Sequence, residues 1–420
     1  MSKTFRDWNP RQNYLFPPSL SDFVPEDHVC HFILTLVNEE LDIREILESY
    51  VEERGYPPHS PKMMTVLLLY GYMKGVYSSR KLSQACRERT DFMYVSGMCR
   101  PDHRPIASFR KRHMAALEGI FKQVVQLCAE AGLIQMKHVA IDGTKIRANA
   151  SSSKNMSYSD LKKSEERLVS EWFEQAEAAD REEDARYGED KRGDEFPRAA
   201  EALERVRKAK KTLEERDRKS REERKKAEQE EGKPKSKTKE RTEPPEDKQY
   251  NFTDPDSGLM RSRQGFIQGY NSQIAVDAES QIIVACSVSQ AKNDLEELIP
   301  VVQEIKDNVS RFPEEVSADS GYCSTENLTK LKQKGIRGYI PKTDKIANVG
   351  IIREMSQRLK KGGRRSRYRI RKYTVEPVFG IIKSARSYSG FLMRGIDSVK
   401  TEWALVCSAH NLWKLAKARS

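Results

Sequence analysis

Residues 137–147 read Lys-His-Val-Ala-Ile-Asp-Gly-Thr-Lys-Ile-Arg, an apolar run that leads into an acid followed by a glycine. Val139 and Ile141 are β-branched and alternate, so they would share one face of a short strand that ends at or near Asp142. Residues 316–319, Val-Ser-Ala-Asp, predict a second short strand that also ends in an acid, Asp319. The two stretches therefore place two carboxylates at strand ends, far apart in the sequence.

The region around these strands alternates strand and helix signals, which favours an α/β fold. A strand pair with a turn between its members and one further strand are predicted at 271–276, 281–288 and 338–340. Helices are predicted at 294–308, 324–334, 375–387 and 399–418. We expect Asp294 to be the N-cap of the first of these helices, and Glu376 stands near the start of the third.

Asp142, Asp319 and Glu376 can converge in space if neighbouring strands and a packed helix carry them. Three converging carboxylates cannot all stay ionised without a cation. Hard oxygen ligands favour Mg²⁺ or Mn²⁺ over zinc, and two such ions roughly 3.5–4 Å apart support phosphodiester chemistry. Taken singly, each acid is better explained as a turn or capping residue.

Residues 1–134 predict a helical domain, with helices at 27–40, 43–53, 62–75, 78–89 and 106–131. Ser60-Pro61 is typical of a helix start, with a serine N-cap and a proline in the first turn. Arg80 and Lys81 lie at the start of a short helix, where basic residues suit a helix-turn-helix DNA reader. A helical bundle with solvated Arg and Lys explains them equally well.

Residues 151–249 differ in composition from the rest of the chain, since charged residues dominate and acids nearly balance bases. Sparse apolar residues at helical spacing predict a helical hairpin that continues as a flexible linker from about Arg224 to Lys248. Because this insertion has a net charge near zero, the positive excess of the chain lies elsewhere.

The composition points to a polyanionic partner. The 420 residues include 75 Lys and Arg against 63 Asp and Glu, a net charge of +12, which favours nucleic acid or an anionic membrane surface. The apolar runs fall short of the ~18 residues that a membrane helix needs, and the start lacks the segments of a signal peptide. We therefore expect a cytoplasmic protein that binds nucleic acid. The seven cysteines are scattered without a C-x-x-C pair, which indicates neither a zinc ribbon nor a disulfide framework.

Four segments occur in an informative order: Ala140-Ile-Asp-Gly-Thr-Lys145, Tyr270-Asn-Ser-Gln-Ile-Ala-Val-Asp277, Ala318-Asp-Ser-Gly-Tyr322, and Val375-Glu-Pro-Val-Phe-Gly380 with Lys383. In this order they resemble the DDE transposases of bacterial insertion sequences, in the broad insertion-sequence four/five superfamily and especially its eleven-eighty-two-type branch. Pro101-Asp-His-Arg, followed by Ser108-Phe-Arg110, also looks like the N-terminal region of that group. The resemblance covers nearly the whole chain except the charged insertion.

The resemblance implies a ribonuclease-H-like catalytic core, interrupted by the charged helical insertion and preceded by an all-helical N-terminal domain. The expected domains are a DNA-binding domain at 1–134, the catalytic domain at 135–150 and 250–420, and the insertion at 151–249. Asp142, Asp319 and Glu376 match the catalytic triad, which binds two Mg²⁺ or Mn²⁺ ions in that family. In such folds the first acid lies on the first strand, the second on the fourth, and the glutamate on a later helix.

Related families also carry a Tyr, Arg, Glu and Lys signature, which Tyr368, Glu376 and Lys383 match here. If Arg371 supplies the arginine, the gap before the glutamate is one residue longer than the common pattern, so Lys372 is the alternative. Lys383 lies about two helical turns beyond Glu376 and could contact a DNA phosphate. Roughly half of residues 353–372 are basic, so we expect DNA backbone contacts there. The further candidates in this cluster are Arg364, Arg365 and Arg367.

The resemblance implies a transposase that binds the terminal inverted repeats of its insertion sequence and catalyses metal-dependent phosphodiester hydrolysis and strand transfer. Its expected partners are double-stranded DNA and, when two ends are paired, a second copy of the chain or more. Its expected location is the bacterial cytoplasm, in association with the nucleoid. Two alternatives remain: a non-catalytic DNA-binding regulator derived from a transposase, and a ribonuclease-H-like nuclease without strand transfer.

Overall fold

The computed structural model describes residues 19–50, 58–163, 199–230, 242–262, 265–344, 346–362 and 367–419. By its internal contacts the chain divides into one unit of residues 1–131 and 405–420 and a second unit of residues 132–404. Within the described ranges, no helix combines the length and the apolar character that a membrane span requires.

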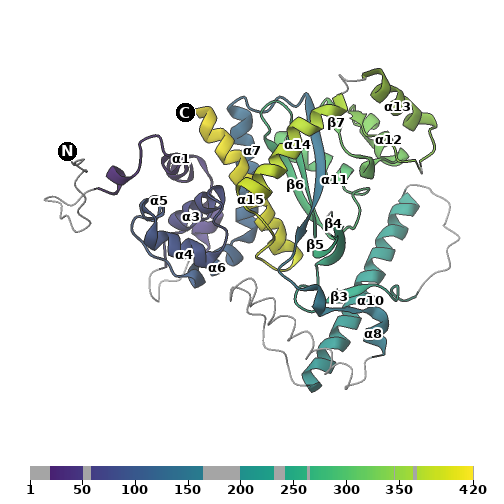
Figure 1. The fold of residues 1–420 in the computed structure, drawn as a ribbon, viewed down its shortest axis with the longest axis horizontal. Coiled ribbons are helices and arrows are strands. Elements are labelled where there is room, and N and C mark those ends of the chain that lie inside the picture. The colour runs from purple at the N-terminus through teal and green to yellow at the C-terminus, as the bar shows by residue number, and fades with distance from the viewer. Residues whose placement is uncertain are drawn as a thin grey trace, which may run out of the picture. The chain divides into compact units, whose positions relative to one another are not determined.

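The first unit is helical, as predicted (Figure 1). Its elements are η1 (Leu20–Phe23), α1 (Val29–Thr35), the π-helix η2 (Leu36–Glu40), α2 (Arg44–Glu48), α3 (Pro61–Met73), α4 (Ser79–Glu88), α5 (Thr90–Val95), α6 (His103–Arg112), α7 (Met114–Glu130) and the last turns of α15 (Ile396–Arg419). The apolar α3 is buried along most of its length. It starts as predicted, because the Ser60 side chain accepts from the Met63 N–H and Pro61 occupies the first turn.

Two predictions for this unit are wrong. The helix expected at 43–53 is the shorter α2, which ends at Glu48. The helix expected at 106–131 is two helices, because the backbone leaves the helical conformation at His113. The His113 ring is buried, packs against Phe109 and contacts the Tyr50 hydroxyl through Nε2 (3.2 Å). This anchoring to a residue far away in the sequence explains why helical periodicity alone did not show the break.

The second unit is built on a mixed sheet with the strand order β4-β5-β1-β7-β8, in which β6 also pairs with β5. The strands are β1 (His138–Arg147), β4 (Gly258–Ser262), β5 (Gly265–Asp277), β6 (Ile283–Ser289), β7 (Glu315–Ser317) and β8 (Arg337–Tyr339). β1 runs antiparallel to β5 and parallel to β7, and β7 runs parallel to β8. This mixed α/β sheet is consistent with a ribonuclease-H-like core. β1 is longer than predicted, so Asp142 lies inside it rather than at its end.

Helices flank this sheet: α11 contacts β5 and β6, and α14 contacts β1 and β5 (Figure 1). The helical elements are α11 (Leu298–Val309), η5 (Ser320–Tyr322), α12 (Thr325–Gln333), α13 (Gly350–Gly362), η7 (Arg367–Arg369), α14 (Ile370–Gly380), the π-helix η8 (Ile381–Ala385) and α15. Ser324 caps α12 as predicted. Two predicted starts are wrong, because α11 begins at Leu298 and α14 at Ile370, which places Glu376 in the second half of its helix.

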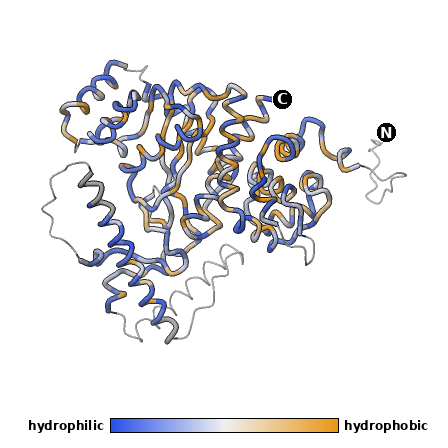
Figure 2. The backbone as a smooth tube through the Cα atoms, turned by 180° about the vertical axis from the view of Figure 1, so that it is seen from behind, coloured by the Kyte–Doolittle hydropathy of each residue, from blue (hydrophilic) through white to orange (hydrophobic). Residues whose placement is uncertain are grey.

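The insertion forms a small structure with its own core. It contains η3 (Ser152–Lys154), β2 (Asn155–Ser157), α8 (Tyr158–Lys162), α10 (Ala199–Glu230) and β3 (Gln249–Asn251), and β2 pairs with β3. α10 is mostly hydrophilic (Figure 2), but Val206, Ala209 and Leu213 are buried against α8 and β2. The prediction that the helix gives way to a linker at Arg224 is wrong, since α10 continues to Glu230. Residues 231–241 lie outside the described ranges.

Arg216, a residue of α10, contacts the segment that precedes β4. Its guanidinium donates to the Pro255 carbonyl (2.8 Å) and pairs with the Asp256 carboxylate (2.6 Å). This charged contact therefore ties the insertion to the segment that leads into the sheet, and the insertion has an apolar core of its own besides.

Leu213→Ala tests whether this core is separate from the sheet. Deleting a buried leucine side chain costs about 3 kcal/mol. We expect faster amide hydrogen exchange in α10 and unchanged exchange in β1 and β5. Lys211→Ala, at an exposed position of the same helix, is the control. Equal loss of protection in the sheet would show that the insertion and the sheet unfold together.

Candidate active site

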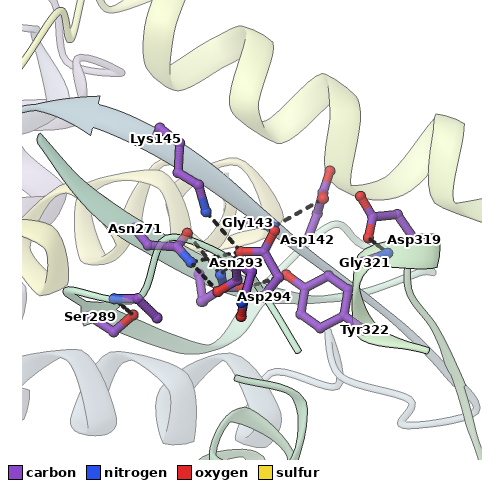
Figure 3. Close-up of polar contacts among 12 residues, drawn as sticks. Asp142, Gly143, Lys145, Asn271, Ser289, Asn293, Asp294, Asp319, Gly321 and Tyr322 are labelled. Atoms are coloured by element: carbon purple, nitrogen blue, oxygen red, sulfur yellow. Dashed lines mark hydrogen bonds and ion pairs between the residues drawn. The ribbon is translucent and has the colours of Figure 1, made fainter. Parts of the chain in front are cut away.

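The pairing of β1 with β7 places two acids side by side. The strands are parallel and in register at Ala140 and Ser317. Two residues further along each chain stand Asp142 and Asp319, where β7 has ended and β1 continues beside β5 alone. Their carboxylates lie next to each other on one side of the sheet (Figure 3). The structure thus places Asp142 and Asp319, two of the three acids singled out in the sequence, close together.

Arg371 is the counter-charge of this pair. Its guanidinium contacts Asp142 Oδ2 at 2.6 Å, and the two side chains are only 13% and 15% exposed. The pKa of Asp142 is raised to about 6, because burial and the nearby charge of Asp319 together outweigh the opposing effect of Arg371. A buried cation thus partly offsets two adjacent negative groups.

Backbone N–H groups donate to one oxygen of each aspartate. The Gly143 N–H donates to Asp142 Oδ1 (3.0 Å), and the Gly321 N–H donates to Asp319 Oδ1 (2.8 Å). The second contact makes Asp319 the N-cap of η5. Asp319 is therefore a capping residue as well as a member of the pair, so the two interpretations of this acid hold together.

Glu376 does not join the two aspartates in this structure. It is exposed on α14, five residues after Arg371, which turns it about 140° away around the helix. Among the described residues, no three His, Cys, Asp or Glu side chains form a group that could hold a metal ion. The predicted convergence of three acids is thus seen for two of them.

The basic candidates fall into different positions. Between the two alternatives for the signature arginine, the contact with Asp142 favours Arg371, while Lys372 is exposed. Tyr368 is half-buried, and Arg367 Nε lies 3.5 Å from the buried Glu315 carboxylate. Arg364 and Arg365 lie outside the described residues.

Lys383 reaches the strand that carries Asp142. Its ammonium donates to the hydroxyl of Thr144, which is two residues after Asp142 and on the same face of β1. Lys383 belongs to the π-helix η8 rather than to a regular continuation of α14, so the predicted spacing of two regular turns from Glu376 is wrong. The wider π-turn directs the lysine toward β1.

Sequence reasoning gave Asp294 the wrong role. It is not the N-cap of α11, a position that Glu297 occupies. Instead its Oδ1 accepts from Lys145 and Asn271 (Figure 3) and also from Gln273. The signal that could have found this cluster is the pair Asn271 and Gln273, two amide side chains at alternate positions of β5, both of them buried.

In the helical unit, Arg80 and Lys81 occupy the first turn of α4, and both are exposed. The Ser78 side chain caps this helix by accepting from the Lys81 N–H. The two basic side chains are thus presented at one helix start, as predicted.

Two family models match the chain. Residues 18–112 match the family described as "Transposase domain (DUF772)", and residues 236–412 match the family described as "Transposase DDE domain". The second match contains Asp319, Glu376 and Lys383, whereas Asp142 lies before it and is joined to the site by the sheet register. No curated protein and no solved structure matches the chain.

Arg371→Gln tests the charge balance of the aspartate pair. Without Arg371 the Asp142 carboxylate is buried without its cation. Its folded pKa already exceeds the ordinary value of 3.8, so ionisation of Asp142 reduces stability as pH rises through about 6, and removing Arg371 enlarges that loss. We expect the free energy of unfolding in urea and EDTA to fall by about 3 kcal/mol at pH 8 and by much less at pH 5.

Two controls accompany this measurement. Adding Asp142→Asn to Arg371→Gln should recover most of the loss, and Lys372→Gln, at the exposed neighbour, should leave stability unchanged. A loss of the same size at both pH values would show that Arg371 does not act through the charge of Asp142.

Proposed function

We propose that this chain, which is a DDE transposase of the insertion-sequence type, binds the terminal inverted repeats of its own element and cuts and joins DNA there. The observation that carries the proposal is the side-by-side placement of Asp142 and Asp319 just past the end of β7, where β1 continues. Lys383 and Arg371 stand on the same face of β1 as this pair.

The donor set suits a hard divalent cation. Carboxylate oxygens are the ligands that Mg²⁺ and Mn²⁺ prefer, and the two adjacent aspartates already attract a cation, Arg371. We propose that Asp142, Asp319 and Glu376 hold two such ions. When bound, two ions activate the attacking hydroxyl and stabilise the leaving oxygen in phosphodiester chemistry. Glu376 would have to join the aspartates from its exposed position on α14.

The remaining side chains of the site suit the DNA backbone. Lys383 contacts Thr144, which is on the same face of β1 as Asp142, and carries a positive charge that can contact the phosphate next to the one attacked. The reaction proposed is attack of water on the phosphodiester at the element end, which frees a 3′-hydroxyl. That hydroxyl then attacks a phosphodiester of the target DNA in line, and each step breaks one P–O bond as it forms another. No covalent bond between protein and DNA is required.

We propose that the helical unit recognises the element ends through α4. Arg80 and Lys81 are exposed at its first turn, and this unit contains the match to the first transposase family. Since transposition joins two ends in one complex, we expect at least two copies of the chain on DNA.

Asp319→Asn tests the catalytic proposal. The assay is cleavage of a labelled duplex that carries the repeats flanking the gene of this chain, in Mg²⁺ or Mn²⁺. We expect cleavage at the element boundary to fall by about a thousandfold while DNA binding persists, because a metal ligand supplies several kcal/mol of transition-state stabilisation. Glu376→Gln should behave alike. Asp307→Asn, an exposed acid on α11, is the matched control.

The outcomes separate the candidate functions. Binding without cleavage by the native chain in either metal would favour the regulator, and nicking without strand-transfer products would favour the nuclease.

Arg80→Ala with Lys81→Ala tests the end-binding surface. If both side chains neutralise phosphates, affinity for the repeat falls and the slope of log K against log [salt] decreases by about two. The measurement is fluorescence anisotropy over a range of salt concentrations, with Lys122→Ala on the exposed face of α7 as the control. An unchanged slope would show that Arg80 and Lys81 of α4 do not contact DNA phosphates.

A further inference from the structure

We propose that Asp294 is a positioning residue of this site, whose carboxylate fixes the turn that carries Asp319 through a chain of hydrogen-bonded side chains. The inference rests on the proposed function, because it concerns the geometry of the same aspartate pair. Asp294 has no place in the predicted triad, and it follows the end of β6 in a loop before α11.

One oxygen of Asp294 is the centre of this chain of hydrogen-bonded side chains. Oδ1 accepts from Asn271 Nδ2 (2.7 Å), Gln273 Nε2 (2.9 Å) and Lys145 Nζ (3.0 Å). An ionised carboxylate is acceptor-only, so it can receive all three donors at once, and the charge of Lys145 matches its own. Strands β1 and β5 and the loop after β6 are thereby joined at a single atom.

Gln273 links Asp294 to η5, the turn that follows Asp319. Its side chain is fully buried, and its Oε1 accepts from the hydroxyl of Tyr322, the last residue of η5. Because Nε2 must donate to Asp294, the amide can present only its oxygen to Tyr322. The carboxylate of Asp294 thus sets the orientation of Gln273, and Gln273 sets the position of Tyr322.

The surroundings of Tyr322 show how close this chain comes to the aspartate pair. Burial raises the pKa of the Tyr322 hydroxyl, and the charges of Asp294, Asp142 and Asp319 raise it further. Tyr322 therefore stays a neutral donor amid three acids. Asn327 Nδ2 connects the Asp294 loop to η5, since it donates to the carbonyls of both Leu295 (2.7 Å) and Tyr322 (2.8 Å).

Two glycines next to the catalytic acids are explained by the same chain. A Cβ on Gly143 would lie 2.4 Å from Gln273 Nε2 and 2.9 Å from Asp294 Oδ1. A Cβ on Gly321 would lie 3.0 Å from Asp319 Oδ1 and 3.8 Å from Asp294 Oδ2. The hydrogen-bonded chain therefore fills the space beside Gly143, the residue after Asp142, and comes near Gly321, whose N–H donates to Asp319.

The chain lies on the opposite face of β1 from Arg371 and Lys383. Gly143 and Lys145 face Asp294, whereas Asp142 and Thr144 face α14 and η8, as the alternation of side chains along a strand requires. Asp294 therefore acts through the backbone positions of the acids and leaves their other face open to DNA.

Asp294→Asn tests the proposal in the full-length chain. An asparagine has the same shape but presents a neutral oxygen or an N–H₂ group, so it cannot hold Lys145 and both amides as the carboxylate does. Glu296→Gln removes an equal charge from an exposed position of the same loop and is the matched control. Tyr322→Phe deletes the hydroxyl at the other end of the chain and provides a second variant should Asp294→Asn fold poorly.

The first readout is amide hydrogen exchange of the peptide containing Gly321, whose N–H is bonded to Asp319, measured without DNA and in EDTA. We expect Asp294→Asn and Tyr322→Phe to raise exchange there by about tenfold while Glu296→Gln and the strands of the sheet stay as in the native chain. Unchanged exchange in both variants, or equal loss of protection throughout the sheet, would overturn the proposal.

The second readout is cleavage of the duplex carrying the element ends in Mn²⁺. We expect kcat to fall 10–100-fold with KM unchanged for Asp294→Asn, the range found when a partner that orients a ligand is removed. Combining Asp294→Asn with Tyr322→Phe should add little, since both act through Gln273. A cleavage rate equal to that of Glu296→Gln would also overturn the proposal. If the native chain does not cleave at all, the proposed function fails, and hydrogen exchange alone decides the role of Asp294.

Discussion

The parallel register of β1 and β7 is the constraint on which the site depends. It brings Asp142 and Asp319 to the same edge, where two like charges in a partly buried position repel each other. Such a pair persists only if its surroundings supply positive charge and hydrogen-bond donors. The guanidinium of Arg371 and the N–H groups of Gly143 and Gly321 meet this need, and they come from three separate segments of the chain.

Strand alternation divides the surroundings of the pair into two layers with different properties. On the face of Asp142 and Thr144 lie the long cationic side chains of Arg371 and Lys383. On the face of Gly143 lies a compact layer of buried amides and hydroxyls, in which each polar atom needs a partner because water is excluded. The first layer has the chemistry to meet a phosphate, and the second fixes the backbone from which the acids extend.

Much of this arrangement could be predicted from the sequence, because its signals are local. The short strands that lead to Asp142 and Asp319, the serine caps at Ser60 and Ser324 and the buried α3 depend on short patterns of apolar, capping and β-branched residues. The role of Asp294 could not be predicted, because its partners come from β1 and β5, far away in the sequence, and an acid before a helix has the same local pattern as an N-cap. The break at His113 and the π-turn at Lys383 likewise depend on contacts made in the folded chain.

The position of Glu376 follows from helix geometry. Arg371 and Glu376 are five residues apart on α14, so a straight helix that directs one toward Asp142 turns the other about 140° away. In this structure the Arg371 side chain points toward Asp142 and contacts its Oδ2, while a backbone N–H donates to Oδ1. A divalent ion at Asp142, as proposed above, would compete with the guanidinium for the same oxygen. Arg371 is thus the counter-charge of Asp142 in this structure, and in that arrangement α14 presents Glu376 on its exposed face.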